Sequence, residues 1–205
     1  MAESATAKTS GRLLSLDVFR GATVAGMMMV NNPGSWSNIY PPFKHAAWNG
    51  WTFTDLIFPF FLWIVGVAMT FSFSKRVEQG ADRNKLMMHT FQRALTIFAI
   101  GLFLNGFPFG LIFGREFSWA AIRIPGVLQR IAICYLAAGS IVLYTNRLWQ
   151  IRWTVIFIVV YWILIKMVPV PEFGPGILEP KGSLAWYIDS LLLSGHTWSG
   201  APAPG

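Results

Sequence analysis

The stretch FTDLIFPFFLWIVGVAMTFSF, residues 53–73, decides the fold class, because it is almost wholly apolar and carries a single charged residue, Asp55. A helix needs ~20 apolar residues, at a rise of ~1.5 Å each, to cross a hydrocarbon core about 30 Å thick. The stretch has this length. It predicts a helix that spans a membrane.

Four further stretches have a similar length and character: residues 14–30, 86–105, 127–144 and 153–170. The first carries Asp17 and Arg20, and these two charges argue against a cleaved signal peptide. We therefore expect an all-α protein, a polytopic transmembrane bundle of about five spanning helices. Residues 1–12 are then a cytoplasmic tail, residues 13–170 the transmembrane domain, and residues 171–205 an extracytoplasmic loop at the truncated end of a longer domain.

The composition supports a membrane protein. Of the 205 residues, 54% are hydrophobic and 12% are charged, whereas an ordinary soluble domain has about 25% charged residues. The formal net charge is +7, but the basic residues lie in short clusters between apolar runs. A protein that tracks phosphates needs a continuous basic surface, so we exclude nucleic acid as a partner.

The single cysteine, Cys134, excludes an intrachain disulfide and a cysteine zinc cluster. No two His, Cys or carboxylate residues stand at metal-ligand spacing within one expected element. We therefore expect no metal site.

The positions of lysine and arginine predict the orientation, because these residues are retained on the cytoplasmic side of a membrane. With five alternating helices, three basic clusters fall on one side: Lys8 and Arg12; Lys75, Arg76, Arg83 and Lys85; Arg147 and Arg152. The intervening loops carry fewer: Lys44, then Arg115 and Arg123, then Lys181. We expect a cytoplasmic N-terminus and an extracytoplasmic loop over residues 31–52.

Charged side chains inside the expected spans are candidates for function, since each costs ~2.5–3.5 kcal/mol on insertion scales. Asp17 and Arg20 stand at i, i+3, so they can form a structural ion pair or serve a ligand. Arg93 lies at a depth similar to that of Arg20. It either extends to the cytoplasmic interface or forms with Arg20 a site for a phosphate group, which guanidinium binds in bidentate geometry.

The fourth expected span begins with RIPGVLQR, residues 123–130. Pro125 suits a first helical turn, and Gly126 permits close helix packing. Gln129 and Arg130 then lie within the span. Hydrogen bonds to neighbouring helices and contact with a polar ligand explain them equally well.

The segment FKHAAWNG, residues 43–50, places His45 just outside a membrane entrance. An imidazole can accept a proton from an amine or hydroxyl nucleophile, or carry an acyl group itself. The plain alternative is an interfacial histidine that only forms hydrogen bonds. Asp55 opens the next helix, where it can cap the helix or orient the imidazole.

Four segments together carry a family resemblance: RLLSLDVFRG (12–21), VNNPG (30–34), FKHAAWNGWTFTDLIFPFFLWIVG (43–66) and RIPGVLQRIAICY (123–135). They resemble, in this order, the front half of the heparan-α-glucosaminide N-acetyltransferase family and its bacterial relatives. The resemblance covers roughly residues 12–145. It implies a multi-span acetyltransferase of a bacterial cytoplasmic membrane.

The resemblance implies transfer of an acetyl group from cytoplasmic acetyl-CoA to an amino sugar or glycan at the opposite face. The family's catalytic histidine maps to His45 and its motif asparagine to Asn31. We expect Asp55 to join them in catalysis, with His45 favoured as general base. The resemblance and the charges inside the spans give the expected acetyl-CoA contacts. Four are matched motif positions, Asp17, Arg20, Gln129 and Arg130, and the fifth is Arg93 of the expected anion site.

Two other functional classes fit the apolar chain. In a transporter or permease component, charged residues would line a substrate path: Asp17, Arg20, Arg93 and Arg130. A scaffold subunit would leave the polar motifs without a purpose. A transporter has no need of a histidine outside the bundle, so His45 favours the acyltransferase. The small residues Gly101 and Gly106 also permit association into a homo-oligomer.

Overall fold

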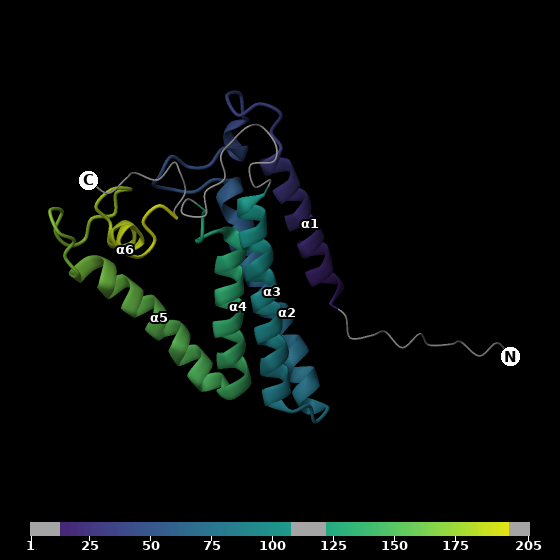
Figure 1. Ribbon diagram of the computed structural model, residues 1–205. Helices are drawn as coiled ribbons and strands as arrows, with labels where there is room; N and C mark the ends of the chain where they lie inside the picture. Colours follow the sequence, from purple (N-terminus) through teal and green to yellow (C-terminus); the bar gives the residue numbers. More distant parts are fainter. Residues whose placement is uncertain (1–12, 108–121, 197–205) are drawn as a thin grey trace. The chain divides into compact units, whose positions relative to one another are not determined.

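Figure 1 shows the computed structural model, which describes residues 13–107 and 122–196. The helices follow in the order α1 (Leu14–Asn31), η1 (Pro41–Phe43, a 3₁₀ turn), α2 (Phe53–Glu78), α3 (Arg83–Gly106), α4 (Val127–Tyr144), α5 (Arg147–Met167) and α6 (Leu184–Leu192). Within these residues the only β pairing is an isolated bridge between Val170 and Gly174. The predicted all-α class is confirmed, whereas the expected tail, residues 1–12, lies outside the described residues.

Four of the described helices are long and apolar enough to cross a membrane: α2, α3, α4 and α5. The helix α1 has nearly the predicted bounds but is not among them. Its charged residues Asp17 and Arg20 lower its mean hydropathy. The protein is thus a polytopic membrane protein of about five long helices, as the sequence predicts.

Capping residues fix the starts of α3 and α5. The helix α3 begins before its apolar stretch because the Asp82 carboxylate accepts a hydrogen bond from Asn84 N at 2.9 Å. Likewise, Asn146 Oδ1 accepts from Trp149 N at 3.0 Å, which places the start of α5 at Arg147. Such caps satisfy backbone N–H groups that have no partner within the helix.

The short helix α6 was not predicted, because it is too short to give a spanning signal. Ser183 caps it, and its Oγ accepts a hydrogen bond from Trp186 N at 3.3 Å. It belongs to the segment that the sequence assigned to an extracytoplasmic loop.

The chain divides into two compact units, residues 1–68 and residues 69–205. In the first unit, Phe19 of α1 packs edge-on against Phe60 and Trp63 of α2, with ring centroids 5.2 and 5.6 Å apart. A Cβ added at Gly26 would lie only 3.0 Å from Ile57 Cδ1. The missing side chain therefore lets these two helices approach closely.

In the second unit, α3 and α4 run side by side (Figure 1). A Cβ added at Gly139 would lie 2.8 Å from Cγ2 of Thr90, which is 1% exposed. Near the other end of the pair, Gly101 packs against Gln129. Gly101 thus serves packing inside the chain, although the sequence also allowed it a role between copies.

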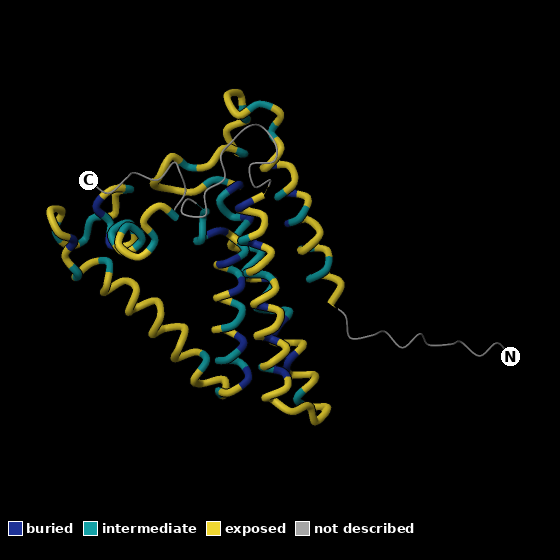
Figure 2. Tube along the Cα trace, viewed as in Figure 1, coloured by how far each residue is buried: buried dark blue, intermediate teal, exposed yellow. Residues whose placement is uncertain are grey.

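The helix α5 is exposed along most of its length. None of its residues is buried, and Figure 2 shows mainly the exposed class along the helix. A helix that is apolar all round needs an apolar environment. The lipid bilayer supplies one.

Candidate active site

The loop before α2 brings His45 back to the start of that helix. Pro41 and Pro42 form the turn η1, and the ring of Phe43 packs against that of Phe53 with centroids 6.2 Å apart. Gly50 then adopts φ +94°, a left-handed conformation that glycine adopts without steric cost. The loop therefore runs alongside the first turn of α2.

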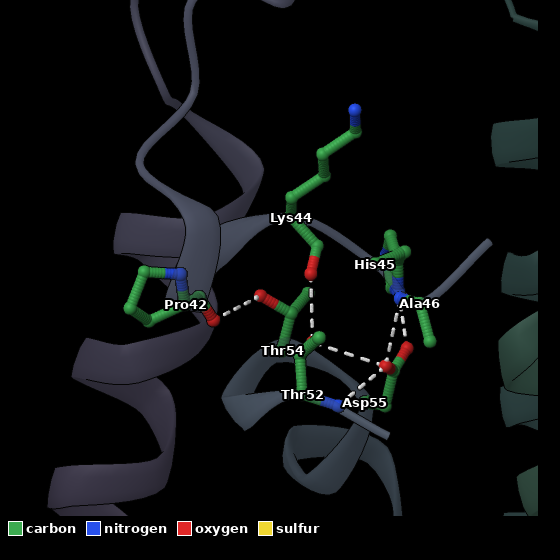
Figure 3. Close-up of polar contacts among 7 residues, drawn as sticks. All are labelled: Pro42, Lys44, His45, Ala46, Thr52, Thr54 and Asp55. Carbon is green, nitrogen blue, oxygen red and sulfur yellow. Dashed lines mark hydrogen bonds and ion pairs between the residues drawn. The ribbon is translucent and has the colours of Figure 1, made fainter. Parts of the chain in front are cut away.

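His45 and Asp55 form a hydrogen-bonded pair in this loop (Figure 3). The distance from His45 Nδ1 to Asp55 Oδ1 is 2.6 Å, which is short for a neutral hydrogen bond and typical of a charge-assisted one. A carboxylate can only accept, so Nδ1 donates its proton. Nε2 then has a free lone pair, and the His45 side chain is 71% exposed.

Three donors lie within hydrogen-bond distance of the second carboxylate oxygen of Asp55. Its donors are Thr52 N at 2.9 Å, Thr52 Oγ1 at 3.0 Å and Ala46 N at 3.1 Å. This set holds the carboxylate in its ionised form and in one orientation. The contacts of Asp55 are compatible with both predicted roles, because Oδ2 accepts from Thr52 at the start of α2 while Oδ1 accepts from His45.

Thr52 is a residue that the sequence reading missed. Its hydroxyl lies 2.7 Å from the Lys44 carbonyl oxygen and 3.0 Å from Asp55 Oδ2. The single proton serves one acceptor at a time, so Thr52 links the backbone before His45 to the carboxylate that orients it. The pattern Thr52-x-x-Asp55 at the head of an apolar run is a capping-box signal that could have revealed it.

Asn31, the third expected catalytic residue, is the last residue of α1 and is exposed. Within the described part of the chain, its side chain forms no hydrogen bond with His45 or Asp55. The structure thus brings together two of the three expected catalytic residues. The role of Asn31 stays a prediction.

The expected cofactor contacts differ in their surroundings. Arg20 Nη1 lies 3.6 Å from Asp17 Oδ1, so these residues form the predicted ion pair, with the Arg20 side chain 46% exposed. Arg93 and Arg130 are exposed on α3 and α4. Gln129 alone is buried, at 2% exposure. The anion site predicted from Arg20 and Arg93 stays a prediction.

Residues 13–107 and 122–196 contain no group of three or more His, Cys, Asp or Glu that could hold a metal ion.

Comparison with known proteins agrees with the motifs. The family model described as "Heparan-alpha-glucosaminide N-acetyltransferase, catalytic" matches residues 12–186. Two curated proteins named heparan-alpha-glucosaminide N-acetyltransferase are similar. The mouse protein is 28% identical over 218 residues, which cover 90% of this chain and 32% of the mouse protein. The human protein is 30% identical over 216 residues, which cover 89% of this chain and 32% of the human protein.

The chain therefore spans about a third of the length of these curated relatives. The family match extends past the region in which the sequence motifs were noticed, through α5 and into α6. The resemblance predicted from four separate segments is confirmed over most of the chain. With its loop histidine, its capping aspartate and its long apolar helices, this chain belongs to the heparan-alpha-glucosaminide N-acetyltransferase family.

Proposed function

We propose that the protein is a membrane-bound acetyltransferase that moves an acetyl group from cytoplasmic acetyl-CoA to an amino sugar or glycan on the extracytoplasmic side. The observation that carries this proposal is the His45–Asp55 pair, whose geometry leaves one imidazole nitrogen free and exposed. Family membership supports the reaction class.

His45 acts as the general base in this proposal. Acetyl-CoA supplies the thioester, which is the activated acyl donor. Nε2 of His45 takes the proton from the attacking amine as the new C–N bond forms. It then gives that proton to the thiolate sulfur released when the C–S bond breaks. A positioned base of this kind contributes typically ~10²–10⁴-fold to a rate.

Asp55 keeps His45 ready for this task. By accepting the Nδ1 proton at 2.6 Å, it selects the tautomer with a lone pair on Nε2. Its negative charge stabilises the imidazolium formed after proton transfer. We assign Asn31 to orienting the reacting groups. The family motif and the exposed position of Asn31 at the end of α1 support this assignment.

The cofactor would be bound by the charged and polar groups of the helices. Arg93 suits a phosphate group, since it is exposed and no described carboxylate pairs with it. Arg20 keeps a half-exposed guanidinium that Asp17 holds in place. Gln129 and Arg130 complete the proposed set.

The proposed sidedness rests on the basic clusters of the sequence. Retention of lysine and arginine in the cytoplasm places the N-terminus inside and the loop carrying His45 outside. We assign the protein to the cytoplasmic membrane of a bacterium, which the resemblance of its sequence motifs implies. The acetyl group would then cross the membrane without passage of CoA.

The test is acetyl transfer from labelled acetyl-CoA to glucosamine in membranes containing the protein. We expect transfer by the wild type and a loss of about 10²-fold or more in His45→Ala, with CoA binding retained. His89→Ala is the matched control, because His89 is an exposed histidine of α3 outside the site. It should retain wild-type transfer.

Two outcomes would contradict the proposal. Transfer that survives in His45→Ala would remove the histidine from the chemistry. If the wild type neither transfers acetyl nor binds CoA, the transporter interpretation, with charged side chains lining a path, replaces the acetyltransferase.

A further inference from the structure

The side-chain amide of Gln129 packs against two glycines, Gly101 and Gly126, whose missing side chains leave room for it. A Cβ added at Gly101 of α3 would lie 2.8 Å from Gln129 Oε1 and 2.9 Å from its Cδ. A Cβ added at Gly126, the N-cap residue of α4, would also collide with this amide. The fold therefore leaves space for a polar group in a helix interface that an apolar residue would otherwise fill.

Two buried donors at the start of α4 have no acceptor within residues 13–107 and 122–196. They are Nε2 of Gln129, a residue that is 2% exposed, and Nε of Arg123. A buried donor without a partner destabilises the fold, and more so when the group is charged. Most buried polar groups in proteins find a partner, so two orphan donors in one short segment indicate a missing acceptor.

The segment that carries these donors is held from two sides. Asn105 Nδ2 of α3 donates to the Arg123 carbonyl oxygen at 2.7 Å. His196 Nδ1 donates to the Ile122 carbonyl oxygen at 2.8 Å, and Ile124 N donates to the His196 carbonyl oxygen at 3.0 Å. The backbone before α4 is therefore held in place next to the start of the helix.

Among the described residues, no negative charge offsets the positive charge of this region. No described side chain caps the N-terminus of α4, where the positive end of the helix dipole lies. In the part of the chain that the structure describes, no carboxylate pairs with Arg123. The Gln129 amide lies against Gly126 through its Oε1 and Cδ atoms, so the amide group is located at this same helix end.

We propose that Gln129, Arg123 and the N-terminus of α4 form a binding site for an oxyanion, a carboxylate or phosphate group of a small ligand. Nε2 of Gln129 and Nε of Arg123 are donors without a described partner, the guanidinium carries a charge, and helix N-termini bind anions through their backbone N–H groups. The site lies in the second unit, away from the His45 loop in sequence. Its existence does not depend on the proposed acetyl transfer.

The test measures anion binding to the full chain in detergent by the shift of its thermal unfolding midpoint. Inorganic phosphate tests whether the site binds an oxyanion at all. CoA represents a ligand with nucleotide phosphates, and glucuronate represents an acidic sugar with a carboxylate. We expect at least one anion to stabilise the wild type. Arg123→Gln and Gln129→Met should each weaken its apparent Kd about tenfold or more. If only CoA stabilises the chain, the site belongs to the cofactor. If only glucuronate does, the site belongs to an acidic acceptor.

Arg152→Gln is the matched control, because Arg152 lies over the Trp149 ring on α5, 4.7 Å from its centroid, and contributes nothing to this site. It should bind the anion like the wild type. Gln129→Met could fail to fold, so Arg123→Gln is the decisive variant in that case. The proposal is overturned if no anion stabilises the wild type, or if both variants bind as the wild type does. The buried donors would then be satisfied by water alone.

Discussion

The Nδ1 atom of His45 lies 2.6 Å from Oδ1 of Asp55, and the other oxygen of that carboxylate caps α2 through Thr52. One side chain thus joins a loop histidine to the end of a rigid helix. The orientation of the imidazole is therefore set by the helix and not by the loop alone. Because the two oxygens have different partners, a substitution that removes the charge but keeps an acceptor can separate catalysis from helix capping.

The substitution Asp55→Asn should lower kcat for acetyl transfer by roughly 10²–10⁴-fold with little change in KM. An amide oxygen can still accept from Thr52 N, but the group no longer carries the charge that stabilises the imidazolium. The measurement is steady-state kinetics in membranes, with circular dichroism to show that the helices persist. A loss below threefold would leave Asp55 as a helix cap only.

Thr52→Val should lower kcat by about tenfold, because it removes a hydrogen bond to a charged group. Thr52→Ser keeps the hydroxyl and should restore most of the rate. Thr54→Val is the matched control, since the Thr54 hydroxyl is 3.5 Å from the Pro42 carbonyl oxygen and does not reach Asp55. Equal kcat values for the Val and Ser variants of Thr52 would show that its hydroxyl does not position the carboxylate.

Gly139→Ala should destabilise the chain by about 1–3 kcal/mol, because the added methyl meets the buried Cγ2 of Thr90. Thr90→Ser removes that methyl and should rescue the variant. The measurement is the thermal unfolding midpoint in detergent. Gly66→Ala is the control, since nothing lies within 4 Å of its added Cβ, and helix propensity predicts a gain of ~0.5–1 kcal/mol. Equal effects at the two glycines would exclude close packing as the cause.

Apolar length predicted the long helices well, because membrane spanning imposes a length on the sequence itself. The helix ends were less predictable, since single side chains such as Asp82 and Asn146 fix them. The spanning signal also missed α6, whose formation depends on its Ser183 cap and on packing of the chain after α5.

The candidate site was predictable in its residue types but not in all its contacts. The motif pointed to His45 and Asp55, and the turn at Gly50 is what brings them together. Asn31 is separated from Asp55 by a long loop, and sequence spacing says nothing about distance across such a loop. Thr52 was missed because a threonine before a helix is common and its second acceptor, the Lys44 carbonyl oxygen, is visible only in three dimensions.

The proposed transfer across the membrane also requires the His45 loop to face outward, and cysteine labelling can test this. The native Cys134 is exposed on α4, so the background variant is Cys134→Ser. In it, Ser37→Cys, between α1 and α2, should react with an impermeant maleimide in intact cells. Gln79→Cys, between α2 and α3, should react only after permeabilisation.

Both positions are exposed, so a difference in labelling reports the side of the membrane and not burial. Retention of lysine and arginine in the cytoplasm predicts this pattern, since Lys75, Arg76, Arg83 and Lys85 flank Gln79. The reverse pattern would put His45 on the same side as cytoplasmic acetyl-CoA. The His45–Asp55 pair could then still act as a base, but the acetyl group would not cross the membrane.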